Sequence, residues 1–266
     1  MRRRSPGGGA LNTLNTLNTP TPNMHPWFIR RDMPTAKRRL FCFPYAGGNA
    51  AAYADWQEKI GPGVEICAVQ LPGRATRFCE PASTSMHELV TQVTAAMAGL
   101  PPLPFAYFGH SMGALLAFET ARYGVARGLP APGHLFASGC AAPQSRDPSK
   151  SRHTLDDDAF IAHLSTYEGT PPAVLAHREL MELVLPTIRA DFSLVDTYTY
   201  LPGEPIPTPI SVLCGTDDPC IRADQYAAWA QETSLSCTTH RFAGNHFFLH
   251  TDTDAVIAHL RHTLLD

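Results

Sequence analysis

Residues 109–113 read G-H-S-M-G, a G-x-S-x-G pentapeptide that stands between a strand-like and a helix-like segment. The preceding residues 104–108 are mostly apolar or aromatic and predict a buried strand, whereas residues 114–122 contain good helix formers and no glycine or proline. A strand, a sharp turn and a helix form a nucleophile elbow, in which a strained backbone exposes the serine hydroxyl. The pattern therefore predicts an α/β fold with Ser111 as a candidate nucleophile.

Strand-like and helix-like segments alternate from residue 39 onward. We expect strands at 40–43, 64–69, 104–108, 135–138, 210–213 and 237–242, and helices at 50–60, 86–98, 114–127, 223–231 and 254–264. Such alternation implies βαβ crossovers and a mainly parallel central sheet flanked by helices. Residues 144–200 interrupt the pattern with two helical stretches, 155–164 and 178–198, and are predicted to form a helical lid inserted between two strands.

Composition and charge exclude several classes of protein. With 266 residues, 44% hydrophobic and 17% charged, the chain can build one large domain, and this size suits a monomer. A net charge of −3 favours no nucleic-acid partner, and no apolar run is long enough to predict a membrane span. The seven cysteines are scattered and contain no C-x-x-C pair, which is typical of reduced thiols in a cytoplasmic protein without a metal framework.

The first 36 residues differ in composition from the rest. They contain three arginines at 2–4, three glycines at 7–9 and three copies of Leu-Asn-Thr over 11–19. Such a segment buries too little apolar surface to offset the entropy of ordering. We therefore predict a disordered N-terminal tail over residues 1–36 and a folded domain over residues 37–266.

A serine nucleophile needs a neighbouring base, and on this kind of fold the partners follow in the order serine, acid, histidine. Of the twelve histidines, His246 lies in a loop directly after the last expected strand and is the predicted base. His250 is the nearest alternative, and we assign it to the surface near the start of the final helix.

The acid is expected where the strand at 210–213 ends, in the sequence Gly215-Thr216-Asp217-Asp218-Pro219. A carboxylate there can accept the imidazole N–H, fix its tautomer and stabilise the imidazolium. Asp218 has the G-x-x-D spacing and is the predicted acid. Asp217 is the alternative, which would otherwise cap the turn or the next helix.

An oxyanion hole needs two backbone N–H groups that point at the developing negative charge. Met112 follows the serine and supplies the first. The second is expected from the loop P-Y-A-G-G-N at 44–49, which follows the first expected strand and contains a glycine pair for tight turning. We assign this donor to Ala46, with Tyr45 as the alternative.

Several segments, in order and spacing, resemble the type II thioesterases, discrete α/β-hydrolase enzymes that accompany polyketide synthases and nonribosomal peptide synthetases. They are F-C-F-P-Y-A-G-G at 41–48, Q-L-P-G-R at 70–74, the pentapeptide with A-F-E at 117–119, L-P at 185–186 with R-A-D-F at 189–192, and G-N-H-F-F-L at 244–249. The resemblance covers about residues 38–265. Asn245 departs from it, since members often have glycine there.

The resemblance implies an α/β-hydrolase fold with Ser111 as nucleophile, His246 as base and Asp218 as acid. It implies an acyl, aminoacyl or short peptidyl substrate in thioester linkage to the phosphopantetheine of an acyl or peptidyl carrier protein, hydrolysed as an editing step. The chain itself would need no cofactor. Two alternatives stay open, a lipase- or esterase-like hydrolase of free esters and a catalytically silent carrier-binding module.

The lid would line an acyl chamber with leucines such as Leu164, Leu175, Leu183 and Leu185. An amphipathic helix that packs against a core places leucines along one face in the same way. Each leucine could therefore line the chamber or belong to ordinary core packing.

Overall fold

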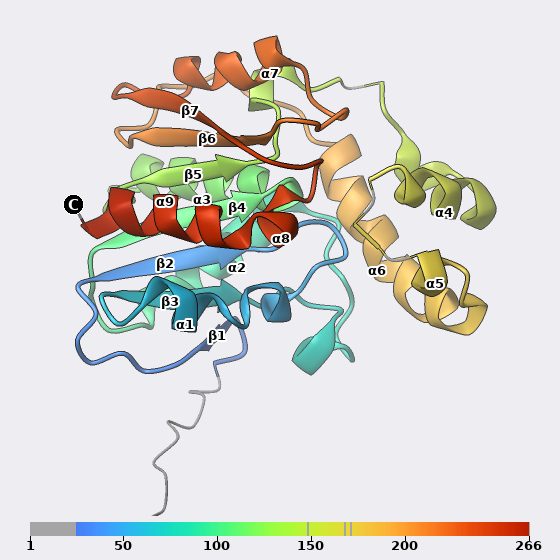
Figure 1. Ribbon diagram of the computed structural model, residues 1–266, viewed down its shortest axis with the longest axis horizontal. Helices are drawn as coiled ribbons and strands as arrows, with labels where there is room; N and C mark the ends of the chain where they lie inside the picture. The colour runs from blue at the N-terminus through green and yellow to red at the C-terminus, as the bar shows by residue number, and fades with distance from the viewer. Residues whose placement is uncertain (1–24, 148, 168, 171, 266) are drawn as a thin grey trace, which may run out of the picture.

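A computed structural model describes residues 25–147, 149–167, 169–170 and 172–265, and within them a seven-stranded sheet lies between two layers of helices (Figure 1). The strands are β1 (Phe28–Arg30), β2 (Arg38–Phe43), β3 (Val64–Val69), β4 (Phe105–His110), β5 (Leu135–Ser138), β6 (Ile210–Gly215) and β7 (Cys237–Phe242). Their spatial order is β1-β3-β2-β4-β5-β6-β7, and every pair is parallel except β1 with β3. The predicted α/β fold with a mainly parallel sheet is confirmed.

The α-helices connect and cover the strands. They are α1 (Trp56–Ile60), α2 (Met86–Ala98), α3 (Met112–Ala126), α4 (Asp157–Ser165), α5 (Pro172–Leu175), α6 (Arg178–Asp196), α7 (Ala223–Ala227), α8 (Phe248–Thr251) and α9 (Thr253–Leu265). The expected helix at 50–60 divides into a 3-10 turn, η1 (Ala50–Tyr53), and α1, and the expected helix at 223–231 divides into α7 and η5 (Ala228–Gln231).

Both faces of the sheet are buried, because alternate residues of a strand point to opposite sides. In β2, Phe41 and Phe43 join the core under α2 and α3, whereas Leu40 and Cys42 join the core under α1, α8 and α9. A strand buried on both sides reads as a continuous, largely apolar run, which is why β3 and β5 were visible in the sequence; the edge strand β7 is mostly exposed or half-buried. This packing leaves the loops at the carboxyl ends of the strands to form a site.

The predicted tail is wrong over residues 25–36. Phe28 is fully buried, and β1 pairs antiparallel with β3 in the register Phe28↔Val69. The guanidinium of Arg77 lies 4.0 Å from the centre of the Trp27 ring. This short strand covers the edge of β3, so its order comes from a partner that lies far along the chain. The rest of the predicted tail, residues 1–24, lies outside the described residues.

Replacement of Phe28 by alanine tests this correction. We expect Phe28→Ala to lower the free energy of unfolding by about 3–5 kcal/mol, because it empties a fully buried aromatic site. Urea unfolding followed by circular dichroism measures the change. An unchanged unfolding midpoint would mean that residues 25–36 behave as a tail after all.

The segment predicted as a lid contains α4, α5 and α6, which lie together beside the carboxyl ends of the strands (Figure 1). These helices bury a small core of their own, made of Phe160, Leu164, Met181, Leu185 and Phe192. The short α5 was not expected. Opening of this segment as a lid stays a prediction.

Within the described part of the chain, no helix has the length and apolar character needed to cross a membrane.

Candidate active site

Ser111 occupies the sharp turn between β4 and α3. Its φ of 53° and ψ of −116° lie outside the regions that residues with a side chain usually adopt. Its N–H donates to the Ser138 carbonyl oxygen at 2.8 Å, which anchors the turn to β5. A Cβ at Gly109 would lie 2.2 Å from the Gly113 oxygen, and one at Gly113 would lie 2.2 Å from the Phe43 oxygen. Both glycines are therefore required for this close approach of strand and helix.

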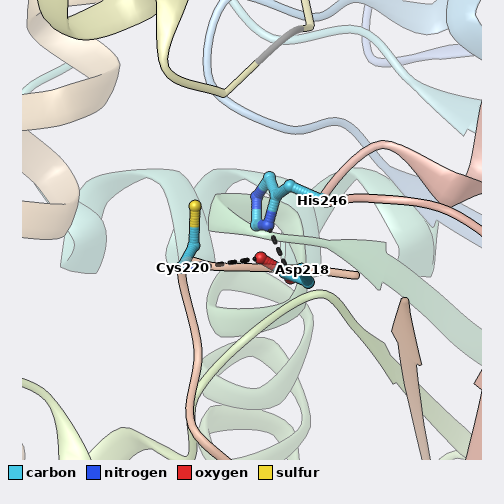
Figure 2. A group of neighbouring side chains, drawn as sticks. All are labelled: Asp218, Cys220 and His246. Atoms are coloured by element: carbon cyan, nitrogen blue, oxygen red, sulfur yellow. Dashed lines mark hydrogen bonds and ion pairs between the residues drawn. The ribbon is translucent and has the colours of Figure 1, made fainter. Parts of the chain in front are cut away.

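His246 and Asp218 form a buried hydrogen-bonded pair (Figure 2). His246 follows β7 and Asp218 follows β6, so two neighbouring parallel strands deliver them to the same edge of the sheet. His246 Nδ1 lies 2.9 Å from Asp218 Oδ2, and the side chains are 4% and 1% exposed. A carboxylate can only accept, so Nδ1 carries the proton and Nε2 is left as the acceptor.

Two further donors hold the Asp218 carboxylate in place. The Tyr226 hydroxyl donates to Oδ2 at 3.0 Å, and the Cys220 N–H donates to Oδ1 at 2.8 Å. Burial raises the pKa of Asp218, but the hydrogen bond and charge of His246, with these two donors, outweigh burial and hold the pKa below its ordinary value. Asp218 is therefore a fixed negative charge beside the imidazole. Tyr226 had no signal in the sequence, because α7 brings it to the site.

The alternative acid, Asp217, and the alternative base, His250, do not belong to this hydrogen-bonded pair. Asp217 is exposed, accepts a hydrogen bond from the Thr216 hydroxyl and donates its N–H to the Gly244 oxygen, so it belongs to the turn. His250 is exposed on α8, and its Nε2 lies 2.9 Å from the Tyr45 hydroxyl. Of the two adjacent aspartates, the structure places Asp218 on His246.

The Asp218–His246 pair lies close to the thiol of Cys220 (Figure 2), with ligand-type atoms of all three residues within 4.8 Å of one another. Burial, with the charge of Asp218, raises the pKa of Cys220 to about 12. The thiol therefore stays protonated, and both Asp218 oxygens already accept hydrogen bonds. This arrangement fits a carboxylate that orients a histidine, and we assign no metal to it.

A second histidine, His110, lies next to the ring of His246. His110 is fully buried at the end of β4, with its ring centre 5.1 Å from that of His246 and its Nδ1 2.9 Å from the Ser138 hydroxyl. Burial lowers the pKa of His110 well below its ordinary value, and the nearby His246 and His250 lower it further. A neutral His110 supports the His246 ring without adding a competing charge.

Ser111 and His246 both line a cavity of about 290 Å³. The two predicted oxyanion-hole residues, Ala46 and Met112, line it too, as does the alternative Tyr45. Met112 is the first residue of α3, so no carbonyl of its own helix can accept its N–H. The site thus brings a hydroxyl, an imidazole and candidate N–H donors to one cavity wall.

The lid segment closes another wall of this cavity with Leu164, Tyr167, Ile188, Phe192 and Val195. The four leucines named from the sequence have different surroundings. Leu164 lines the cavity, Leu185 is buried and Leu175 partly buried in the segment's own core, and Leu183 is 55% exposed.

We expect Tyr226→Phe to lower kcat about tenfold, because it removes a hydrogen bond to a charged group, worth about 1.5 kcal/mol, that holds the Asp218 carboxylate toward His246. Steady-state kinetics on an acyl thioester measures the change. Tyr107→Phe is the matched control, since that hydroxyl donates to Met97 Sδ and does not line the cavity. An equal loss in both variants would show that Tyr226 only supports the fold.

Comparison with known proteins places the chain among thioesterases. Residues 38–264 match the family model described as "Thioesterase domain". The chain is 39% identical over 244 residues to a protein named linear gramicidin dehydrogenase LgrE, from Brevibacillus parabrevis, covering 90% of this chain and 92% of LgrE. It is 38% identical over 225 residues to thioesterase PikA5 of Streptomyces venezuelae, covering 84% and 80%.

A solved structure gives the same assignment. The type II thioesterase BorB from the borrelidin biosynthetic cluster superposes with a TM-score of 0.82 at 36% identity, covering 90% of this chain and 98% of BorB. LgrE is named for a dehydrogenase, whereas the family model, PikA5 and BorB are thioesterases. The family model, which matches residues 38–264, shows that the chain belongs to the thioesterases.

Proposed function

Since this chain belongs to the thioesterase family and is a hydrolase of thioester bonds, we propose that Ser111, His246 and Asp218 are its catalytic triad. The observation that supports this most is the buried His246–Asp218 pair, whose His246 lines the same cavity as the strained Ser111. The proposed substrate is an acyl, aminoacyl or short peptidyl group bound as a thioester to the phosphopantetheine of a carrier protein. The likeness to the type II thioesterase BorB, and to ClbQ from the colibactin NRPS/PKS pathway (TM-score 0.81 at 30% identity), supports a proposed editing role in polyketide or nonribosomal peptide synthesis.

In the first half of the reaction, the Ser111 hydroxyl oxygen attacks the thioester carbonyl carbon while His246 Nε2 takes the hydroxyl proton. The negative charge passes to the carbonyl oxygen, which the N–H groups of Ala46 and Met112 stabilise. Collapse of this intermediate breaks the carbon–sulfur bond. The thiol of the pantetheine arm leaves with the proton from His246, and the acyl group remains on Ser111.

In the second half, His246 takes a proton from water as the water oxygen attacks the acyl-Ser111 ester. The new intermediate breaks the bond to Ser111, which regains its proton from His246, and the free acid is released. Asp218 stays ionised throughout, holds the imidazole and stabilises its charged form. No step needs a cofactor of the chain itself. We propose that it acts as a monomer in the cytoplasm, with an acyl or peptidyl carrier protein as partner.

The test compares three substrates that share one acyl group: the carrier-protein thioester, the free pantetheine thioester and the corresponding oxygen ester. We expect the highest kcat/KM for the carrier thioester and a loss of at least about 10⁴-fold in kcat for Ser111→Ala. Hydrolysis of the oxygen ester without hydrolysis of the carrier thioester would favour the esterase alternative. Binding of the carrier protein without hydrolysis of any substrate would favour the silent binding module.

A further inference from the structure

A buried ion pair lies behind the cavity and joins two segments that are distant in the sequence. Arg74 Nη1 and Nη2 donate to Asp191 Oδ2 and Oδ1 at 2.6 and 2.7 Å. The side chains are 8% and 1% exposed. Asp191 belongs to α6 of the lid segment, whereas Arg74 belongs to the loop after β3. Such a bidentate ion pair fixes the relative orientation of the two side chains as well as the distance between them.

The pair also holds two peptide groups of the loop at 44–49, the one between Ala46 and Gly47 and the one between Gly48 and Asn49. Asp191 Oδ2 accepts the Gly47 N–H at 2.7 Å, and Arg74 Nη1 donates to the Gly48 carbonyl oxygen at 3.0 Å. Gly47 follows Ala46, the proposed oxyanion donor, and has a φ of +76°. The acceptor of the Gly47 N–H therefore sets the orientation of the turn that presents the Ala46 N–H.

The lid helix packs on the same two loops at other points. A Cβ at Gly47 would lie 3.1 Å from Ile188 Cγ1, so the helix leaves no free space over that residue. The hydroxyl of the preceding residue, Thr187, donates to the Gly73 carbonyl oxygen at 2.9 Å. Because interiors pack densely, a shift of α6 would be transmitted to both loops.

We propose that Asp191 and Arg74 are positioning residues that hold the Ala46 N–H toward the reacting carbonyl oxygen, so that the oxyanion hole is complete only when α6 is seated. The inference rests on the proposed function, because it assigns Ala46 to the transition state. Donors stabilise an oxyanion only when they point at it beforehand, and small misplacements are costly. Asp191 does not line the cavity, so it acts through the loop.

The test uses Asp191→Asn, together with the double variant Arg74→Leu/Asp191→Leu, which leaves no unpaired buried charge and so avoids the penalty of a broken pair. We expect kcat to fall about 10- to 100-fold in both and KM to change less than about twofold. This loss is smaller than the roughly 10²- to 10³-fold typical of a deleted oxyanion donor, because the Ala46 N–H is misplaced and not removed. An alkyl boronic acid, which forms a tetrahedral anion on the serine, is expected to bind more weakly by the same factor.

Glu65→Gln is the matched control, since Glu65 pairs with Arg39 in a second buried ion pair and neither residue lines this cavity. We expect it to lower the unfolding midpoint while kcat and boronate affinity stay at wild-type values. Wild-type kcat and boronate affinity in a folded Asp191→Asn or double variant would overturn the inference. Boronate binding needs no carrier protein, so its dependence on Asp191 would survive even if the proposed carrier substrate were wrong.

Discussion

Ser111→Ala is expected to lower kcat for an acyl-carrier thioester by about 10⁴- to 10⁶-fold, the loss typical of removing the nucleophile of a serine triad. The Ser111 hydroxyl oxygen is the atom that forms the covalent bond to the acyl group. No other side chain of this turn can take its position. Ser111 has a φ of 53° between two glycines that tolerate no Cβ, so a neighbouring residue cannot move into position. Chromatographic separation of loaded and unloaded carrier protein measures the rate.

Alanine should keep the fold, because it removes one oxygen from a half-buried position. The unfolding midpoint by circular dichroism is the control for this. A folded Ser111→Ala with more than about one hundredth of wild-type kcat would contradict a role as nucleophile. The residual activity of a serine triad that has lost its nucleophile is far lower than that.

Asp218→Asn has the second largest expected effect, a fall in kcat of about 10³- to 10⁴-fold. An asparagine amide facing His246 Nδ1 would stabilise the wrong tautomer and would supply no negative charge for the imidazolium. Because His246 Nδ1 and Asp218 Oδ2 are 2.9 Å apart, the replacement changes the group that contacts the imidazole itself. Steady-state kinetics with the same carrier thioester measures the loss.

The chain offers a matched control for this variant in the next residue. Asp217→Asn is expected to keep kcat within about twofold, because an exposed surface replacement has little effect and Asp217 contacts the turn instead of His246. Should Asp217→Asn lose activity while Asp218→Asn keeps it, the assignment of the acid would be reversed.

Local pattern was enough to predict much of the fold. The strands Val64–Val69, Leu135–Ser138 and Cys237–Phe242 and the helix Met86–Ala98 have the bounds expected from the sequence. The first two strands are short, largely apolar runs that are buried on both sides, and the helix has an amphipathic pattern, so each could be read locally; Cys237–Phe242 is an edge strand with mostly exposed or half-buried residues. The strand–turn–helix at Ser111 was predicted for a similar reason, since its glycines and flanking segments are contiguous.

What depends on distant partners could not be predicted. Strand β1 has only three residues and becomes ordered by pairing with β3, so a composition typical of a tail concealed it. Tyr226 and the Arg74–Asp191 pair act through contacts that no local period reveals. Arg74 and Asp191 appeared in separate motifs of the resemblance, and only the fold shows that they meet.

The identity of the acid, Asp217 or Asp218, could be predicted only in part from the sequence. Spacing favoured Asp218, but two successive residues of a turn point in different directions, and the direction depends on the backbone of the turn. The structure turns Asp218 inward to three donors and leaves Asp217 exposed. Motif spacing therefore located the segment, and backbone geometry selected the residue.

The most direct test of the proposed mechanism is the covalent intermediate itself. The enzyme is mixed with an acyl-carrier thioester, quenched in acid during turnover and digested, and the peptides are measured by mass spectrometry. The triad mechanism predicts an added acyl mass on the peptide that contains Ser111, and this mass is absent from Ser111→Ala. Rapid turnover with no acyl adduct on Ser111, or with an adduct on another residue, would contradict it.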